Sequence, residues 1–264
     1  MKLCSLTSGS SGNSIYIEGE RAKILVDCGA SEKYISSNIP IDIKELDAIF
    51  ITHEHIDHIN GLGVMMRKHN IPVFLTEDTL KAILDSNKIG KVDTNYFNII
   101  RGDRAFSIGN TEILPFSISH DAVDPVGFRF KSNNTNIAIA TDLGMFDDYI
   151  IDNLKGLNCI MLEANHDVRM LECGPYSYSL KKRIQSIYGH LSNDDASYLL
   201  SKVISDKTKD IVLGHLSSEN NYHEIAHMTV RNFLKHNRDD IDINEINIDV
   251  AMKRIRGRCI EVGE

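Results

Sequence analysis

A short polar cluster, residues 53–58, reads His-Glu-His-Ile-Asp-His and constrains the fold more than any other segment. It follows the apolar run 46–52, which predicts a buried strand, and precedes residues 61–69, which have the pattern of a helix. The cluster is therefore expected on a strand-to-helix loop, where rigid elements hold polar side chains together. Imidazole and carboxylate groups are ligands for Zn, Mn or Fe, so His53 and His55 can bind one ion while Asp57 and His58 reach a second. The alternative interpretation is a chance run of polar loop residues.

Composition places the chain among ordinary globular proteins. Its 264 residues are 42% apolar and 25% charged. No apolar stretch approaches the roughly 18 residues that span a bilayer, and no signal-peptide core is present, so we expect a cytoplasmic protein without a membrane partner. Five scattered cysteines argue against both a disulfide framework and a structural zinc site. The net charge of −8 argues against a sequence-reading DNA-binding module, but not against an enzyme that holds phosphates locally.

Strand and helix signals alternate along the chain, with no tandem repeat and no Pro-rich linker. The first part reads as short strands with a Gly/Ser hairpin loop at 8–13. The last third reads as mainly helical, with buried strands at 159–162 and 211–213. We therefore predict a single α/β domain over residues 1–264, with a pair of sheets inside and helices outside.

Three further metal-ligand candidates each follow an apolar strand, the position at which α/β folds gather a site. His120 follows a predicted strand at 112–119, Asp142 follows 137–141, and His215 follows 211–214. Each alone would more simply be a hydrogen-bonded histidine or a turn residue. Together with the cluster at 53–58 they predict a two-metal site, for which about seven or eight ligands are needed.

The order of these residues along the chain, beginning with Asp27, resembles the motifs of the metallo-β-lactamase fold superfamily. The resemblance implies a four-layered αβ/βα sandwich with the site at one edge of the two sheets. Asp142 stands where zinc β-lactamases have Cys, and His55 where flavodiiron proteins have Glu. The short interval from Asp142 to His190 implies that the inserted domain of the β-CASP nucleases is absent.

The same resemblance divides the ligands between two divalent ions, which can be Zn, Mn or Fe. It assigns His53, His55 and His120 to the first ion, Asp57, His58 and His215 to the second, and Asp142 to a bridging position. Asp27 would orient the ligands from behind.

Residues 189–192, Gly-His-Leu-Ser, with Ala196 downstream, resemble the His-Ser-Thr motif of the tRNA-processing RNase Z enzymes. Residues 159–164 resemble the strand in those enzymes whose Glu hydrogen-bonds the motif's histidine. The resemblance makes His190 the general acid and Glu163 its partner, since a carboxylate stabilises an imidazolium. Asp57 is counted with them as a catalytic residue. The alternative is that Ser192 or Asn193 caps a helix at 194–203 beside an incidental histidine, and both interpretations can hold together.

Residues 8–13, 162–167, 189–193 and 213–221 together resemble the YycJ (WalJ, VicX) group of bacterial proteins, which are associated with 5′-to-3′ exonuclease activity on double-stranded DNA. The resemblance implies a metal-dependent phosphodiesterase whose nucleic-acid substrate is the end of a DNA duplex. The two metals would activate water, and His190 would protonate the departing 3′ oxygen. His166 is expected either to contact a phosphate or a strand terminus, or to make a structural hydrogen bond.

Two basic stretches, 181–183 and 253–258, are interpreted first as solvated surface. For nucleic-acid contacts outside the metals, Lys181, Lys182 and Arg183 are favoured, on a helix predicted at 179–187. A rival function is a hydrolase of thioesters, lactones or small cyclic phosphodiesters with the same metals. Another is a metal-binding regulatory protein without catalysis.

Overall fold

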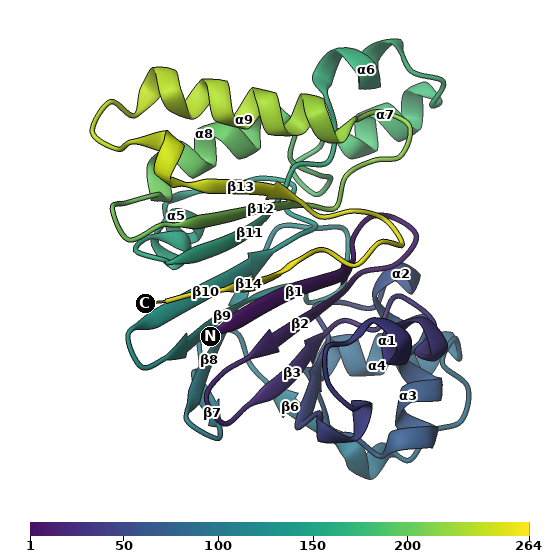
Figure 1. Ribbon diagram of the computed structural model, residues 1–264. Helices are drawn as coiled ribbons and strands as arrows, with labels where there is room; N and C mark the ends of the chain where they lie inside the picture. Colours follow the sequence, from purple (N-terminus) through teal and green to yellow (C-terminus); the bar gives the residue numbers. More distant parts are fainter. Residues whose placement is uncertain (264) are drawn as a thin grey trace. The chain divides into compact units, whose positions relative to one another are not determined.

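The computed structural model describes residues 1–263, which divide into two compact units. The first unit consists of Met1–Ser117, Ala122–Asn134 and Met252–Glu261, and the second of Ile118–Asp121, Thr135–Ala251 and the chain from Val262. Figure 1 shows the elements of both units along the chain. None of the helices in the described chain is long and apolar enough to cross a membrane.

The first unit contains a seven-stranded sheet in the order β14-β1-β2-β3-β4-β5-β6. Strands β14 to β3 pair antiparallel, and β3 to β6 pair parallel. Strands β7, β8 and β9 of the same unit pair antiparallel with one another. The bounds are β1 Lys2–Thr7, β2 Ser14–Glu18, β3 Lys23–Val26, β4 Ala48–Phe50, β5 Val73–Thr76, β6 Phe97–Ile100, β7 Phe106–Ile108, β8 Thr111–Ser117, β9 Val126–Ser132 and β14 Cys259–Glu261.

Four helices connect the parallel strands of this sheet: α1 Glu32–Asn38, α2 Ile56–Ile59, α3 Leu62–His69 and α4 Glu77–Ser86. Figure 1 shows them grouped beside the sheet, and their buried side chains share a core with its strands. Short 3-10 helices at Ile43–Glu45 and Thr94–Tyr96 precede β4 and β6. Because parallel strands end at the same edge of a sheet, the loops after β3 and β4 are neighbours.

The second unit is built on four parallel strands in the order β10-β11-β12-β13. Strands β11 and β12 are buried along their whole length, as expected for a parallel sheet whose apolar runs are continuous. Helix α8 packs against both α5 and α9, and α9 contacts β13. The bounds are β10 Thr135–Ala140, α5 Asp148–Leu154, β11 Cys159–Glu163, α6 Val168–Cys173, α7 Tyr178–Ile184, α8 Asn193–Val203, β12 Asp210–Gly214, α9 His223–Asn237, a 3-10 helix Ile243–Glu245 and β13 Asn247–Val250.

Most predicted elements lie where the structure has them, including the hairpin loop at 8–13 between β1 and β2. The helix predicted at 179–187 ends earlier, at Ile184, because the chain then turns back on itself. In that turn the backbone N–H of His190 donates to the carbonyl of Ile184, and a Cβ on Gly189 would lie only 2.1 Å from the same oxygen. The last third also contains β13 and β14, two short strands that the sequence pattern did not indicate.

No disulfide joins the five cysteines, all of which lie within the described residues. Cys4, Cys28 and Cys159 are buried, whereas Cys173 is exposed. Buried cysteines of this kind behave as small apolar residues.

Candidate metal centre

The first group of candidate residues lies after β3 and β4 in the first unit. Asp27 ends β3 with a positive φ of 62°, which turns its carboxylate toward the end of β4. The carboxylate is fully buried, and it accepts hydrogen bonds from the backbone N–H of Thr52 at 2.9 Å and from the Thr52 hydroxyl. It also binds Nδ1 of His58 at 2.7 Å. Asp27 is therefore hydrogen-bonded to the loop that carries the candidate ligands, and the orienting role that the resemblance implies for it stays a prediction.

The three imidazoles of the 53–58 cluster lie together. The ring of His53 is centred 4.6 Å from that of His55 and 4.1 Å from that of His58. Nδ1 of His53 lies 3.0 Å from the Thr52 hydroxyl. Helix α2 begins immediately after His55 and carries Asp57 in its first turn, so the four candidate ligands lie within six residues of the chain.

Asn13, which the sequence did not single out, lies directly beside two of these ligands. Its backbone N–H donates to the carbonyl of Asp57 at 2.8 Å. Its side-chain oxygen accepts from the backbone N–H of Gly9 at 2.8 Å, and this contact fixes which end of the amide is the NH2 group. That NH2 group lies 3.0 Å from Nε2 of His58 and 3.4 Å from a carboxylate oxygen of Asp57. Asn13 therefore donates toward the atoms that are candidates to bind metal.

The second group of candidate residues follows three strands of the parallel sheet in the second unit. Asp142 follows β10, Glu163 ends β11 and His215 follows β12. Asp142 and His215 both have positive φ, 60° and 55°, and so each turns out of its strand at the same edge of the sheet. One oxygen of Asp142 lies 3.4 Å from Nδ1 of His215 and 3.8 Å from Nε2 of His120. The donor atoms of Asp142, Glu163, His190 and His215 all lie within 4.8 Å of one another.

Glu163 is buried and hydrogen-bonds two other members of this group. Its Oε1 binds Nδ1 of His190 at 2.8 Å and Nδ1 of His215 at 2.7 Å. Its Oε2 accepts from the backbone N–H groups of Leu143 at 2.8 Å and Leu191 at 3.2 Å. Burial alone would raise the pKa of Glu163, but the charges and hydrogen bonds of His190 and His215 outweigh it and lower the pKa to about 2. The group is therefore a carboxylate at neutral pH.

The predicted pairing of Glu163 with His190 is present, and Glu163 also binds His215. The His190 side chain is 14% exposed whereas Glu163 is fully buried, so the imidazole has one face toward the carboxylate and another toward solvent. Ser192 caps α8 by accepting from the backbone N–H of Asp195, so the capping interpretation holds together with the pairing. The helix begins one residue earlier than predicted, at Asn193.

His120 is held by the segment that leads to His190. Its Nδ1 lies 3.2 Å from the carbonyl oxygen of Gly189, and the backbone N–H of Asp121 donates to the carbonyl of Tyr188. Burial is the main reason that the pKa of His120 is lowered. The imidazole is therefore neutral near pH 7, which is the form that binds metal.

His166 is buried, and its Nδ1 has no hydrogen-bond partner within residues 1–263. Burial lowers the pKa of His166 to about 4. Its backbone carbonyl accepts from the N–H of Asn193 at 2.8 Å. Around it lies a network of buried amides that the sequence did not indicate, in which Asn165 donates to the carbonyl of His215 at 2.8 Å and Asn221 donates to the carbonyl of Ala164.

The three basic residues predicted to contact nucleic acid lie on α7, and each has a local partner. Lys181 donates to the carbonyl of Glu172, and Lys182 lies over the ring of Tyr178. The Arg183 guanidinium pairs with Asp121. Lys182 and Arg183 are nevertheless exposed, so their role in binding DNA stays a prediction.

The donor set fits divalent metal ions. In His53, His58, His120 and His215, Nδ1 faces an oxygen of a hydroxyl, a carboxylate or a backbone carbonyl. A proton on Nδ1 places the lone pair of the ring on Nε2, and this arrangement is typical of histidines that bind metal. Together with the buried carboxylate of Asp142, these imidazoles offer the nitrogen and oxygen ligands that Zn, Mn and Fe accept.

Comparison with known proteins agrees with this chemistry. The family model described as the β-lactamase superfamily domain matches residues 22–216, most of the chain. This chain belongs to the metallo-β-lactamase superfamily. The predicted α/β fold class and the resemblance on which it rested are thereby confirmed. The metallo-β-lactamase fold and the two donor groups indicate binding of divalent metal.

Two metallo-β-lactamase relatives are similar over most of their length. Exodeoxyribonuclease WalJ of Streptococcus pneumoniae serotype 2 (strain D39) is 43% identical over 232 residues, 87% of this chain and 86% of that protein. Exodeoxyribonuclease YycJ of Bacillus anthracis is 40% identical over 233 residues, 87% of this chain and 88% of that protein. A solved structure, the metallo-β-lactamase fold protein YhfI from Bacillus subtilis, shares the fold with a TM-score of 0.70 at 13% identity, over 97% of this chain and 98% of that one.

Proposed function

We propose that this chain is a metal-dependent phosphodiesterase, a 5′-to-3′ exonuclease that acts on the ends of double-stranded DNA. The similarity to two exodeoxyribonucleases over most of the chain supports the substrate class. The contact between Glu163 and His190 carries the mechanism, because it supplies an acid for a leaving oxygen. A DNA substrate is consistent with a location in the cytoplasm, which we also propose.

The two donor groups would bind two divalent ions, Zn or Mn with Fe as an alternative, and the two units would form one domain. His53, His55 and His120 would hold the first ion, Asp57, His58 and His215 would hold the second, and Asp142 would contribute to both. When bound, the ions would lower the pKa of a water molecule and neutralise charge on the scissile phosphate.

A side chain of the protein would supply the proton that the leaving oxygen needs. Glu163 holds Nδ1 of His190, so the proton available for transfer is on Nε2. Water adds to phosphorus and loses a proton to the solvent while the bond to the 3′ oxygen breaks. His190 gives its Nε2 proton to that oxygen and afterwards regains a proton from the solvent. The products are a 5′-mononucleotide and a DNA strand shortened by one residue. Unchanged in this step, Glu163 stabilises the charged imidazole.

His166 would contribute to substrate binding. It is buried with Nδ1 unpaired within the described chain, and the alternative of a structural hydrogen bond from that nitrogen has no partner to support it. A phosphate oxygen or a strand terminus would satisfy it. Lys181, Lys182 and Arg183 would add longer-range attraction for the DNA backbone.

The test is His190→Ala, with His236→Ala, an exposed histidine of α9, as the matched control. We expect His190→Ala to keep its metal content while release of mononucleotides from 5′-labelled duplex falls by about 10²–10⁴-fold. The loss should be small with the p-nitrophenyl ester of thymidine 5′-phosphate, because that leaving group needs no proton. An equal loss on both substrates would remove the general-acid role. Wild-type hydrolysis confined to small diesters would reject the exonuclease.

A further inference from the structure

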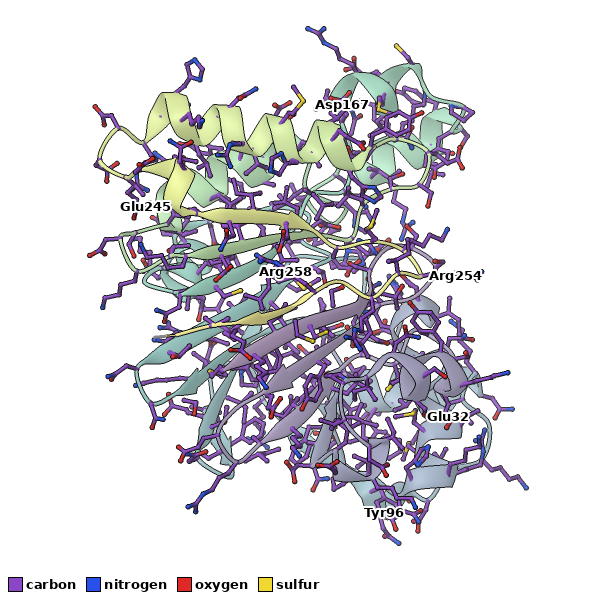
Figure 2. The ribbon with its side chains drawn as sticks, viewed as in Figure 1. Glu32, Tyr96, Asp167, Glu245, Arg254 and Arg258 are labelled. Atoms are coloured by element: carbon purple, nitrogen blue, oxygen red, sulfur yellow. The ribbon has the colours of Figure 1, made fainter. Side chains whose placement is uncertain are left out.

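The segment 252–258 of the first unit is strongly basic in an acidic protein. Lys253, Arg254, Arg256 and Arg258 fall within six residues, with no Asp or Glu between 250 and 260, whereas the whole chain has a net charge of −8. All four side chains are exposed. Figure 2 labels Arg254 and Arg258 on this segment. We call residues 252–258 the basic turn.

The basic turn is attached to the loop at 8–13. The backbone N–H of Ser8 donates to the carbonyl of Met252 at 3.1 Å. The backbone N–H of Arg254 donates to the hydroxyl of Thr7 at 3.0 Å, and that hydroxyl donates in turn to the carbonyl of Gly12 at 3.1 Å. The next residue of the loop is Asn13, whose amide lies beside Asp57 and His58. Every contact in this chain of hydrogen bonds lies within the first unit, so the backbone of the basic turn is tied, through the loop, to the segment that carries Asp57 and His58.

Arg254 has a backbone conformation that is unfavourable for its residue type. Its φ is 55°, a region in which Gly or Asn is more easily accommodated. Such a conformation persists where the surrounding structure imposes it, here through the hydrogen bond from the backbone N–H of Arg254 to Thr7, and strained residues cluster at binding sites. Within residues 1–263 neither Arg254 nor Arg256 pairs with a carboxylate, although Arg256 donates to the carbonyl of Asn38 at 3.2 Å. Their charge is therefore not neutralised by the protein.

We propose that the basic turn binds the phosphodiester backbone of the DNA substrate, with Arg254 and Arg256 as its main contacts. This inference rests on the proposed function and names a second surface for its substrate. Guanidinium groups match phosphate oxygens in shape and charge, and each contact releases counterions from the duplex. DNA is favoured over an anionic membrane because the turn is tied to the loop that carries Asn13. Ile255, 55% exposed between the two arginines, makes lipid the alternative to test.

The experiment compares three double variants with wild type on 5′-phosphorylated duplex DNA. Arg254→Asn with Arg256→Gln removes both charges, and Asn suits the positive φ at 254, so the turn is kept. Arg254→Lys with Arg256→Lys keeps both charges on the same backbone. Lys207→Gln with Lys235→Gln, two exposed lysines of the second unit, changes the net charge equally and serves as the control.

We expect the charge-removing variant to raise KM at low salt with kcat unchanged. The slope of log KM against log salt, between about 50 and 200 mM, should fall by roughly 0.9 for each phosphate that the arginines no longer neutralise. The lysine variant should keep most of the slope, and the control should match wild type. Hydrolysis of the p-nitrophenyl ester should be the same in all four proteins.

A salt slope that is unchanged in the charge-removing variant, in a wild-type protein that does degrade duplex DNA, overturns this proposal alone. Failure of wild type on every DNA substrate overturns the proposed function instead. Co-sedimentation with phosphatidylglycerol vesicles that is abolished in the charge-removing variant, with the DNA slope intact, would assign the turn to lipid and reject DNA.

Discussion

Replacing Glu163 with Gln should destabilise the protein more than any change of equal size on its surface. The carboxylate accepts four hydrogen bonds, two from imidazoles and two from backbone N–H groups. A glutamine of the same shape has one acceptor oxygen and one NH2 group, so in either orientation two donors face another donor. A buried unsatisfied donor costs about 1–3 kcal/mol, so we expect a loss of about 4 kcal/mol in the free energy of unfolding.

The same substitution should weaken metal binding, because His215 loses the acceptor that orients it. Loss of such an outer partner typically lowers metal affinity by about 10–100-fold, which competition with a chelator measures. Stability is measured by urea unfolding of the chelator-treated protein. The matched control is Glu245→Gln, whose side chain is 70% exposed and pairs with Lys209 at 3.4 Å. It should change stability by less than about 0.5 kcal/mol.

A cost of less than about 1 kcal/mol for Glu163→Gln, with metal affinity at the wild-type value, would refute the role given to this carboxylate. In that case the four donors would bind other acceptors, and the Glu163 carboxylate would not be needed to hold His190 and His215 in place. A stability loss with unchanged metal affinity would leave Glu163 a structural residue and remove the orienting role toward His215.

Two further substitutions test the packing and the burial around the candidate ligands. Gly29→Ala should destabilise the protein by more than about 2 kcal/mol and lower its metal affinity, because the new Cβ would lie 1.7 Å from the carbonyl oxygen of Asp57. The control is Gly257→Ala, whose Cβ would lie 3.6 Å from the nearest atom, the carbonyl oxygen of Ser5. Equal unfolding curves for the two variants would contradict the expectation. His166→Gln should reduce the amount by which the free energy of unfolding falls in acid. The pKa of His166 is about 4 in the folded protein, against an ordinary value of 6.5. Below pH 6.5 the unfolded chain therefore binds a proton that the folded chain takes up only near pH 4. Chelator-treated wild type should therefore lose about 3 kcal/mol more than the variant between about pH 7.5 and 4 in urea unfolding, and parallel pH profiles would show that His166 does not titrate in this way.

The candidate ligands could be predicted from sequence because they are rare residue types placed just after apolar strands. His53, Asp142 and His215 each needed only a strand prediction and a side chain suited to metal. Glu163 and His190 could be paired only by resemblance, since they are 27 positions apart. That Glu163 also binds His215 has no local sequence signal, because it depends on the register of β11 against β12.

Asn13 and the short strands were missed for a related reason. In sequence Asn13 reads as one residue of a Gly/Ser turn, and its role arises from a contact with Asp57, 44 positions away. Strand β14 has three residues, too few for any periodic pattern, and it forms because the free edge of β1 offers hydrogen-bonding partners. Helix α2, with four residues, is set by the ligand loop around it. Elements of this length are decided by tertiary contacts.

The pairing of β14 with β1 also has a consequence during translation. Strand β1 (Lys2–Thr7) leaves the ribosome long before its partner β14 (Cys259–Glu261) is made. At roughly 5–20 residues per second, more than about ten seconds pass in which a nascent chain presents an uncovered strand edge. The basic turn is made just before β14, so a nascent chain that already carries all the candidate metal ligands still lacks both segments. The edge of β1 is therefore covered within a few residues of the point at which the basic turn is added.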